Sequence, residues 1–379
     1  MPNTISPERP KMIPVNEPLL SPRAKKYVLD CLDTGWISSA GTYIQRFEEA
    51  FARYLGCRFA VTTSSGTAAL HLAIATLGFG PGDEVIIPDL TIISCALAVI
   101  YAGARPVLVD VDPVTFTLDP ELIEKKITKR TKAIMVVHLY GHPADMDPIL
   151  KLAKKYRLAV IEDAAEAHGA RYKGRLVGSL GTIGTFSFYA NKIVTTGEGG
   201  MVVADDATLA RKARLLKDLA HSPGRRFWHE EIGFNYRLTN LSAAIGLAQL
   251  ELVKTYLRKK RWMAGEYAKA LRGIPYLSPP AEMSWAKSVF WMYALTLTPD
   301  APVTRDNLRA KLKELGIDTR DFFYPLHLQP VLRKYVQKTD RFPVSDSVSR
   351  RGFYLPSGLA ITKTQIRTVA GALRTILKK

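Results

Sequence analysis

The sequence contains few cysteines, and their arrangement indicates neither a disulfide framework nor a metal site. Only Cys31, Cys57 and Cys95 occur among 379 residues. They are odd in number and widely spaced, and no two form a CxxC pair. Disulfide-rich secreted domains and zinc-binding modules have paired cysteines at short spacings. Both classes are therefore disfavoured.

Long apolar runs are also absent. The longest uncharged run near the middle, Ile92 to Ala104, has 13 residues and contains Ser94. A membrane-spanning helix needs about 20 apolar residues. The first twenty residues carry charges and prolines where a signal peptide has an apolar core. We therefore expect a cytoplasmic protein that does not associate with membranes.

Basic residues exceed acidic ones by 53 to 35, which gives a net charge of +18. Such a balance favours polyanionic partners, namely nucleic acid, an anionic membrane or a phosphorylated small substrate. The basic residues form several short groups rather than one long arm, and no zinc-finger or RNP pattern accompanies them. Dedicated nucleic-acid binding is therefore disfavoured.

Short apolar strands alternate with helices along most of the chain. Strands are predicted over Phe59–Thr63, Glu84–Ile87, Val107–Val111, Ala133–His138, Leu158–Glu162, Thr185–Phe188 and Met201–Ala204, and helices over Thr67–Leu77, Ile92–Tyr101, Pro120–Ile127 and Asp147–Tyr156. This alternation predicts an α/β fold with a mostly parallel central sheet that is covered on both faces.

Three regions are predicted along the chain. Residues 1–20 are proline-rich and form an extended arm, residues 21–255 form the large domain, and residues 256–379 form a smaller α+β domain. A long helix is expected after Asn240 and continues into the basic run LRKKRW near the boundary. The small domain is predicted to contain a strand over Phe290–Leu297 and helices over Arg305–Leu315 and Thr364–Leu377.

The stretch Thr62–Thr67 places hydroxyls and a glycine between a strand and a helix. A helix N-terminus with hydroxyls nearby can bind a phosphate. No Gly-Lys-Ser/Thr follows, so the stretch is not a P-loop. Ordinary capping of the helix by Ser or Thr is the alternative.

Two ionisable residues stand at predicted strand ends, where open α/β sheets bind ligands. Asp163 closes an apolar strand, and a buried carboxylate there needs a partner, such as a cationic ring nitrogen. Lys192 follows a strand among aromatic residues, where burial lowers the pKa of an amine and makes it nucleophilic. An N-cap for Asp163 and a solvated surface position for Lys192 are the alternatives.

Other polar residues give a weaker signal. The stretch Gly233–Asn240 contains Asn235 and Arg237, which could bind an anion or belong to a capped loop. His138 and His142 are four residues apart, but Gly141 lies between them and no HExxH motif is present, so a metal site is disfavoured. A lysine, an acid and a phosphate-binding helix start together fit pyridoxal phosphate.

Long stretches of the chain resemble one enzyme family. They are WISSAG (36–41), SSGTAALHLA (64–73), VHLYGHPADMDPIL (137–150), IEDAAEAHGA (161–170), TFSFYANKIVTTGEGGM (185–201), GFNYRLTNLSAAIGLAQLE (233–251) and VFWMYALTL (289–297). They resemble the DegT-type nucleotide-sugar aminotransferases, which have the PLP-dependent transferase fold of type I. Within the family, the chain is most similar to the branch that makes GDP-perosamine by aminating C4 of GDP-4-keto-6-deoxymannose.

The resemblance implies roles for individual residues. Lys192 matches the lysine that forms the imine with the cofactor, Asp163 the acid on its ring nitrogen, and Glu166 the residue that binds its 3-hydroxyl. Ser65, Gly66, Thr67 and Ser187 match the phosphate cradle, Asn235 a phosphate ligand from the second subunit of a homodimer, and Arg237 and His327 positions near the substrate.

One departure from the family concerns the face of the cofactor ring. Relatives commonly place an aromatic residue against it, whereas this chain has Ile92 in the run Leu90–Ile93. The resemblance thus predicts an aliphatic face there. A dehydratase branch has His in place of the lysine, so Lys192 favours transamination from L-glutamate. The alternatives are a UDP- or dTDP-linked keto sugar as substrate, or a non-catalytic regulator with the same fold.

Overall fold

The structure, a computed structural model of the chain, describes residues 12–222 and 224–378. Its centre is a seven-stranded sheet with the strand order β1-β9-β8-β5-β4-β2-β3. The strands are β1 (Phe59–Thr63), β2 (Glu84–Pro88), β3 (Arg105–Val109), β4 (Thr131–Val137), β5 (Ala159–Asp163), β8 (Ile183–Ser187) and β9 (Gly200–Ala204). Only β9 runs antiparallel to its neighbours, which confirms the predicted α/β fold with a mostly parallel sheet.

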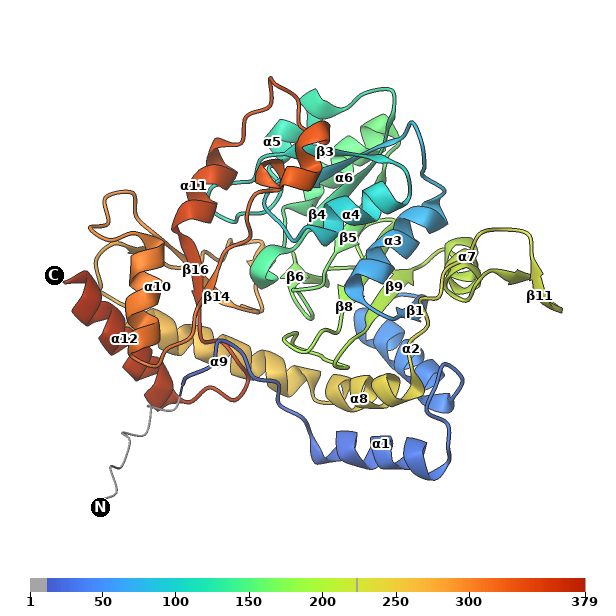
Figure 1. Cartoon of the computed structure of the whole chain (residues 1–379), viewed down its shortest axis with the longest axis horizontal. Helices are drawn as coiled ribbons and strands as arrows, with labels where there is room; N and C mark the ends of the chain where they lie inside the picture. Colours follow the sequence, from blue (N-terminus) through green and yellow to red (C-terminus); the bar gives the residue numbers. More distant parts are fainter. Residues whose placement is uncertain (1–11, 223, 379) are drawn as a thin grey trace, which may run out of the picture.

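Helices surround this sheet in the large part of the molecule (Figure 1). They are α1 (Pro22–Asp33), α2 (Thr42–Leu55), α3 (Gly66–Leu77), α4 (Ser94–Tyr101), α5 (Pro120–Ile123), α6 (Met146–Tyr156), α7 (Ala207–Lys217) and α8 (Asn240–Leu250). α3 packs on β8, β9 and α4, α6 packs on β4 and β5, and α2 and α1 pack on α8. Ser65 caps α3, since its Oγ accepts from Ala68 N at 3.1 Å, and Gly78 ends the helix with φ of +78°.

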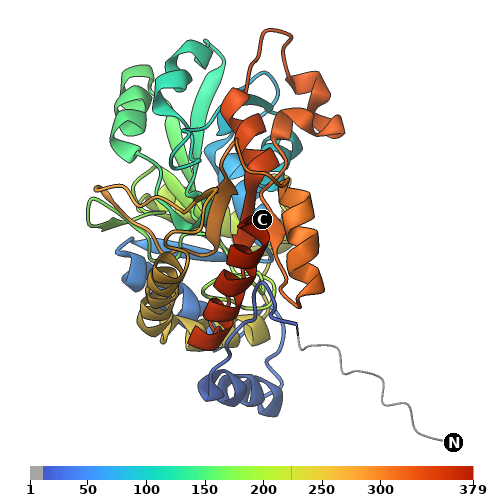
Figure 2. The same cartoon turned by 90° about the vertical axis from the view of Figure 1, so that its left-hand side faces the viewer.

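The C-terminal part, which faces the viewer in Figure 2, has its own antiparallel sheet and its own apolar core. Its sheet has the order β12-β14-β16-β15. Its elements are α9 (Val253–Ala270), β12 (Leu277–Ser278), β14 (Tyr293–Leu297), α10 (Arg305–Glu314), β15 (Arg320–Asp321), α11 (Pro343–Arg351), β16 (Gly352–Leu355) and α12 (Lys363–Leu377). A second apolar cluster, which includes Tyr267 and Leu373, lies between α9, α12 and this sheet.

The two apolar clusters divide the chain less simply than the predicted boundary at 255/256. Val253 belongs to the first cluster and Met263 to the second, so the change does occur within α9. However, Phe322, Leu332 and Val348 return to the first cluster. The division at 255/256 therefore stays a prediction, because part of the C-terminal region packs on the large core.

Several predicted elements have different bounds in the structure, and two of these differences lie between Asn240 and Leu297. The helix expected after Asn240 is two helices, α8 and α9, which are separated at Glu251 and Leu252. The carboxylate of Glu251 there accepts from Arg23 and Tyr27 of α1. The strand expected from Phe290 begins at Tyr293, because Phe290 has a left-handed φ of 49° and the chain turns before β14.

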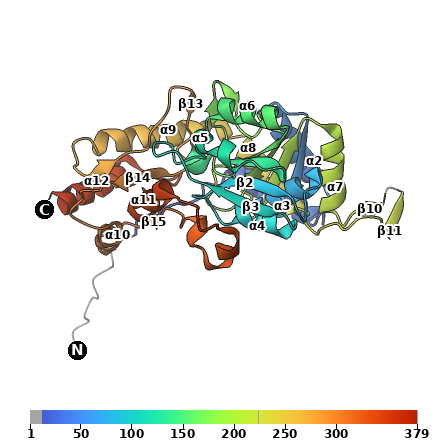
Figure 3. The same cartoon turned by 90° about the horizontal axis from the view of Figure 1, so that it is seen from above.

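Two small β units remain among the described residues. They are the sheet of β6 (Arg171–Tyr172), β7 (Arg175–Leu176) and β13 (Ala286–Lys287), and the hairpin of β10 (His221–Ser222) and β11 (Arg225–His229). The hairpin projects beyond α7, away from the body of the molecule, in both Figure 1 and Figure 3. Among the described residues, no helix is long and apolar enough to cross a membrane.

Residues 12–20, the described part of the predicted arm, form no helix, and their role as a separate arm stays a prediction. Ile13 forms a bridge with Ile317, and the carbonyl of Val15 accepts from Ser357 N at 2.8 Å. Residues 1–11 of the predicted arm lie outside the described residues. The Nδ2 of Asn16 donates to the carbonyl of Asn191 at 2.6 Å, so the arm reaches the residue that precedes Lys192.

Candidate active site

The carboxyl ends of neighbouring strands bring most of the predicted site residues together. Asp163 ends β5 and Ser187 ends β8, and these two strands pair in parallel. α3 starts next to Ser187 and runs back across β8. The ligand site of an open α/β sheet is expected at this edge.

A cavity of about 300 Å³ opens at this edge of the sheet. Its lining includes eight of the predicted residues: Ser65, Gly66, Thr67, Ile92, Asp163, Glu166, Ser187 and Lys192. They come from the start of α3, the loop before α4, the end of β5, and β8 with the turn that follows. A lysine, two acids and a helix N-terminus therefore line the same cavity.

Lys192 lies in a tight turn, in which its own backbone N–H donates to the carbonyl of Tyr189 at 2.9 Å. Its Nζ is 3.7 Å from Oε1 of Glu166. Burial lowers the pKa of the amine below its ordinary value, against the charges of Glu166 and Asp163, which raise it. An amine desolvated in this way is more often neutral, and hence nucleophilic, than a surface lysine.

Asp163 is buried and has two hydrogen-bond donors. Its Oδ1 accepts from Ala165 N at 3.0 Å, and its Oδ2 accepts from the thiol of Cys95 at 3.3 Å. Burial raises the pKa of the carboxyl, while the Ala165 N–H and the charge of Lys192 lower it. A carboxylate has about four acceptor positions, so this side chain can still accept a proton donor from the cavity.

Glu166 is held by the turn that follows β4. Its Oε2 accepts from Tyr140 N at 2.8 Å, and Tyr140 has a left-handed φ of 52° within the 3₁₀ turn Leu139–Gly141. Burial raises the pKa of the Glu166 carboxyl to about 7, although the charge of Lys192 lowers it. The side chain can therefore donate or accept a hydrogen bond near neutral pH.

The start of α3 lies in close contact with the end of β8. A Cβ atom on Gly66 would lie only 2.6 Å from Cβ of Ser187, so the two backbones meet where no side chain fits. The first N–H groups of a helix have no acceptor within the helix and are directed at whatever lies beyond its end. The hydroxyl of Thr67 donates to Ser94 Oγ at 2.9 Å, which fixes it at the rim. These groups fit a phosphate.

Ile92 also lines the cavity and is 39% exposed, so an aliphatic side chain stands where the resemblance placed the ring face. The predicted helix from Ile92 begins two residues later, at Ser94. Ile92 therefore lies in the preceding loop, from which its side chain can reach the cavity.

The other three predicted residues do not line this cavity. Asn235 pairs with Asp218 through the backbone, and Arg237 forms an ion pair with the carboxylate of Asp218. Both lie just beyond the projecting hairpin. Neither residue therefore lines the cavity that contains Lys192 of the same chain.

His327 is occupied by other partners. Its Nδ1 lies 2.7 Å from Oδ2 of Asp89, its Nε2 lies 3.5 Å from Asp346, and its ring stacks on Phe342. Burial lowers the pKa of His327, but the hydrogen bond and charge of Asp89 outweigh it and raise that pKa overall. Its predicted position near the substrate stays a prediction.

His138 and His142, the two histidines considered above as metal ligands, have structural partners. His138 Nε2 lies 3.0 Å from the buried carboxylate of Glu162, and its Nδ1 accepts from Ala144 N. His142 Nδ1 lies 2.7 Å from the carbonyl of Pro143. Within the described ranges, no group of three or more His, Cys, Asp or Glu side chains could hold a metal ion.

Sequence reasoning missed several residues of this site. The indole of Trp291, the rings of Phe323 and Tyr354, and the thiol of Cys95 contact the cavity or its acids. Three of the four come from the C-terminal part of the chain. No local pattern marks them, since apolar and aromatic residues are ordinary residues of a protein core.

The profile of the DegT/DnrJ/EryC1/StrS aminotransferase family matches residues 19–374. The chain belongs to this family. A GDP-perosamine synthase of Caulobacter vibrioides is 47% identical over 366 residues, which cover 96% of this chain and 98% of the relative. The predicted family, fold class and aminotransferase activity are thus confirmed.

Solved structures of sugar aminotransferases have the same fold as this DegT/DnrJ/EryC1/StrS family member. DesV of Streptomyces venezuelae is 37% identical, with a TM-score of 0.88 over 94% of both chains. The PLP form of Spr1654, a sugar aminotransferase from Streptococcus pneumoniae, is 25% identical, with a TM-score of 0.92 over 97% of this chain and 99% of the other.

Proposed function

We propose that this chain uses pyridoxal phosphate to move an amino group from L-glutamate to the C4 keto group of GDP-4-keto-6-deoxymannose, which yields GDP-perosamine. One observation carries the proposal: the amine of Lys192 and the carboxylate of Asp163 share one buried cavity at the sheet edge. The relative at 47% identity is named for the same product.

The residues of the cavity fit pyridoxal phosphate in charge and shape. The cradle at Gly66 and Ser187 admits an anion where a Cβ would clash, and Asp163 has free acceptor positions for a protonated ring nitrogen. Glu166 would hold the ring hydroxyl, and Ile92 would pack on the ring. When bound, the cofactor supplies an aldehyde that bonds amines and a ring that accepts the electron pair of a carbon that loses its proton.

Lys192 acts as the proton carrier in this proposal. Burial desolvates its Nζ and lowers the pKa of the amine. The amine can therefore take the proton from the α-carbon of the amino donor and later return a proton to C4 of the sugar. Asp163 would remain charged beside the ring nitrogen of the bound cofactor and would keep that nitrogen protonated. Burial of both groups excludes water from the reacting atoms.

We further propose that two copies of the chain share their active sites. Asn235 and Arg237 lie outside the cavity of their own chain, next to a hairpin that projects from the body. Ile232, which is 89% exposed, and the half-exposed Trp228 give this region an apolar surface. Exposed apolar groups of this kind are typical of protein interfaces. In a homodimer, this segment would complete the partner's site.

The net charge of +18 supports a diphosphate-bearing substrate. The test is to incubate the protein and pyridoxal phosphate with L-glutamate and a panel of GDP-, UDP- and dTDP-linked keto sugars. We expect amino-sugar formation with release of 2-oxoglutarate for GDP-4-keto-6-deoxymannose. Turnover of a UDP- or dTDP-linked sugar instead would show that the proposed substrate is wrong. Binding without any turnover would indicate a non-catalytic regulator.

A further inference from the structure

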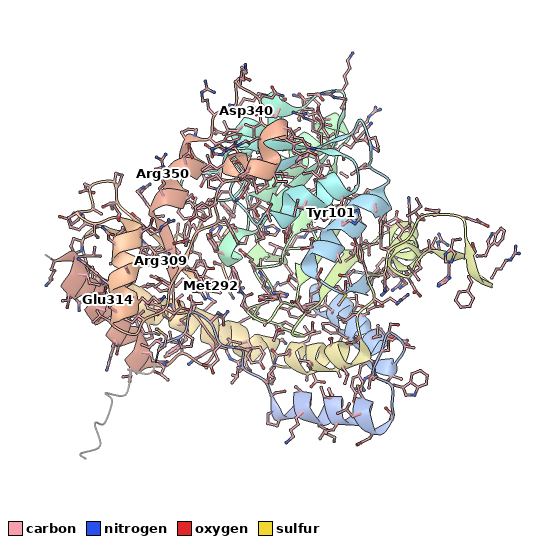
Figure 4. All side chains as sticks on the ribbon, viewed as in Figure 1. Tyr101, Met292, Arg309, Glu314, Asp340 and Arg350 are labelled. Atoms are coloured by element: carbon pink, nitrogen blue, oxygen red, sulfur yellow. The ribbon has the colours of Figure 1, made fainter. Side chains whose placement is uncertain are left out.

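Trp291 contacts the one amine on which the proposed reaction depends. Its indole is 2% exposed, and the centre of the ring lies 4.0 Å from Nζ of Lys192. The next residue, Met292, is labelled in Figure 4 and lies where the C-terminal part meets the large body. Trp291 itself lies just before β14, and its side chain lines the cavity.

The indole is fixed at its edge. Its Nε1 donates to the carbonyl of Asn191 at 2.8 Å, and the same carbonyl accepts from Asn16 Nδ2 at 2.6 Å. Because Asn191 directly precedes Lys192, these two hydrogen bonds fix the ring and the lysine backbone to the same peptide group. The ring cannot move from the amine without breaking one of them.

The backbone of Trp291 is fixed as well. Its carbonyl accepts from Nζ of Lys260 at 2.8 Å, and Lys260 is a buried residue of α9 whose amine also donates to the carbonyl of Ser357. At the backbone nitrogen of Trp291, a Cβ on Gly141 would lie only 2.8 Å away, so only glycine admits this close approach. The packing therefore determines one orientation of the indole.

An aromatic face attracts a cation, most strongly when both are desolvated and the ring is an indole. The amine of Lys192 is buried, so little water competes for its charge. The ionisable groups around this pair are those of Glu166, Asp163, His168 and Tyr354, and Tyr189 and Glu198 line the same cavity. The amine of Lys260 contacts the backbone carbonyl of Trp291. Burial lowers the pKa of His168 to about 3, so that ring adds no charge.

We propose that Trp291 is a catalytic residue whose ring face stabilises the ammonium form of Lys192. This inference rests on the proposed function, in which Lys192 must hold a proton between two transfers. Burial alone favours the neutral amine. The indole offsets part of that effect without adding a negative charge that would compete with Asp163 for the cofactor.

The test measures how fast the apoprotein binds pyridoxal phosphate covalently as a function of pH, because only the neutral amine reacts. Trp291→Leu should move the midpoint of this profile to lower pH by about one pH unit, a tenfold change in proton affinity. Trp291→Phe keeps a ring face and should move it by less than half as much. Trp262→Leu is the matched control, since Trp262 contacts Lys259 at 3.9 Å on the surface, and it should move nothing.

Two results would overturn the inference: an unshifted profile for Trp291→Leu, or equal shifts for the Leu and Phe variants, which would assign the effect to the Nε1 hydrogen bond. Should Trp291→Leu fail to fold, fluorinated tryptophans can replace all five tryptophans of the chain with little change of shape. The midpoint should then fall as fluorine atoms are added, and a constant midpoint would contradict the inference. Wild-type protein that captures no cofactor at any pH would instead contradict the proposed function.

Discussion

The Nζ of Lys192 lies 3.7 Å from Oε1 of Glu166, with both side chains at the wall of the same buried cavity. Burial acts on the two groups in opposite directions, since it lowers the pKa of the amine and raises that of the carboxyl. Burial therefore favours the neutral form of both groups. Ionisable groups whose pKa values are shifted in this way are typical of functional sites.

The raised pKa of Glu166 predicts how stability depends on pH. The ordinary pKa of this carboxyl is 4.5, whereas the folded chain keeps it protonated up to about pH 7. Ionisation of the carboxyl therefore destabilises the fold as the pH rises from 4.5 to about 7. Glu166→Gln stays neutral at every pH. Urea unfolding of the apoprotein should show a gain for the variant on the order of 1–3 kcal/mol at pH 8 and little gain at pH 5. Equal effects at the two pH values would contradict the assignment.

Replacement of Asp163 separates cofactor binding from reaction. Asp163→Asn keeps the shape of the side chain and the hydrogen bond from Ala165, but it removes the charge that would hold a ring nitrogen protonated. We expect pyridoxal phosphate to bind and kcat/KM to fall by about 100-fold or more. Cofactor binding is followed by absorbance titration, and turnover by release of 2-oxoglutarate. Unchanged kinetics would remove the proposed role of Asp163.

The close approach of Gly66 to Ser187 predicts the effect of one added methyl group. Gly66→Ala would place Cβ 2.6 Å from Cβ of Ser187, and overpacking of this kind costs about 1–3 kcal/mol. Thermal unfolding should show a lower Tm, and titration should show weaker binding of pyridoxal phosphate. Gly265→Ala is the control: nothing lies within 4 Å of its Cβ, and it should stabilise α9 by about 0.5–1 kcal/mol. Similar losses in the two variants would argue against a special role for the cradle.

Shared sites predict complementation between two inactive variants. Lys192→Ala removes the amine of one chain, and Asn235→Ala removes a side chain that would serve the partner's cavity. In a mixed dimer, one of the two sites keeps both residues. We expect mixtures refolded together to regain about a quarter of the wild-type activity, half of the dimers being mixed with one intact site each. Activity that never exceeds that of the separate variants would contradict a shared site.

The strand-end residues of the site were predictable because their local sequence determines their position. Asp163 ends an apolar strand, Ser65 caps a helix, and Lys192 follows β8, so the parallel sheet alone brings them to one edge. The structure has them in one cavity, as expected. Their chemical roles stay predictions, since they depend on the cofactor.

Residues that reach the site through tertiary packing were not predictable. The sequence places Trp291 in a predicted strand, whereas in the structure the turn at Phe290 and the hydrogen bond from its Nε1 to the carbonyl of Asn191 direct its ring to Lys192. His327 shows the converse, because nothing in its local sequence indicates that Asp89 lies 2.7 Å from its Nδ1. Contacts between residues 100 or more positions apart leave no local pattern.

The most direct test of the central claim is an absorbance titration of wild-type protein and Lys192→Ala with pyridoxal phosphate, followed by addition of L-glutamate. Wild-type protein should show the band of a covalently held cofactor, lose it when glutamate is added, and release 2-oxoglutarate. Lys192→Ala should show neither the band nor sustained turnover with a keto sugar nucleotide. A variant that retained both would contradict the assignment of Lys192 and the account that depends on it.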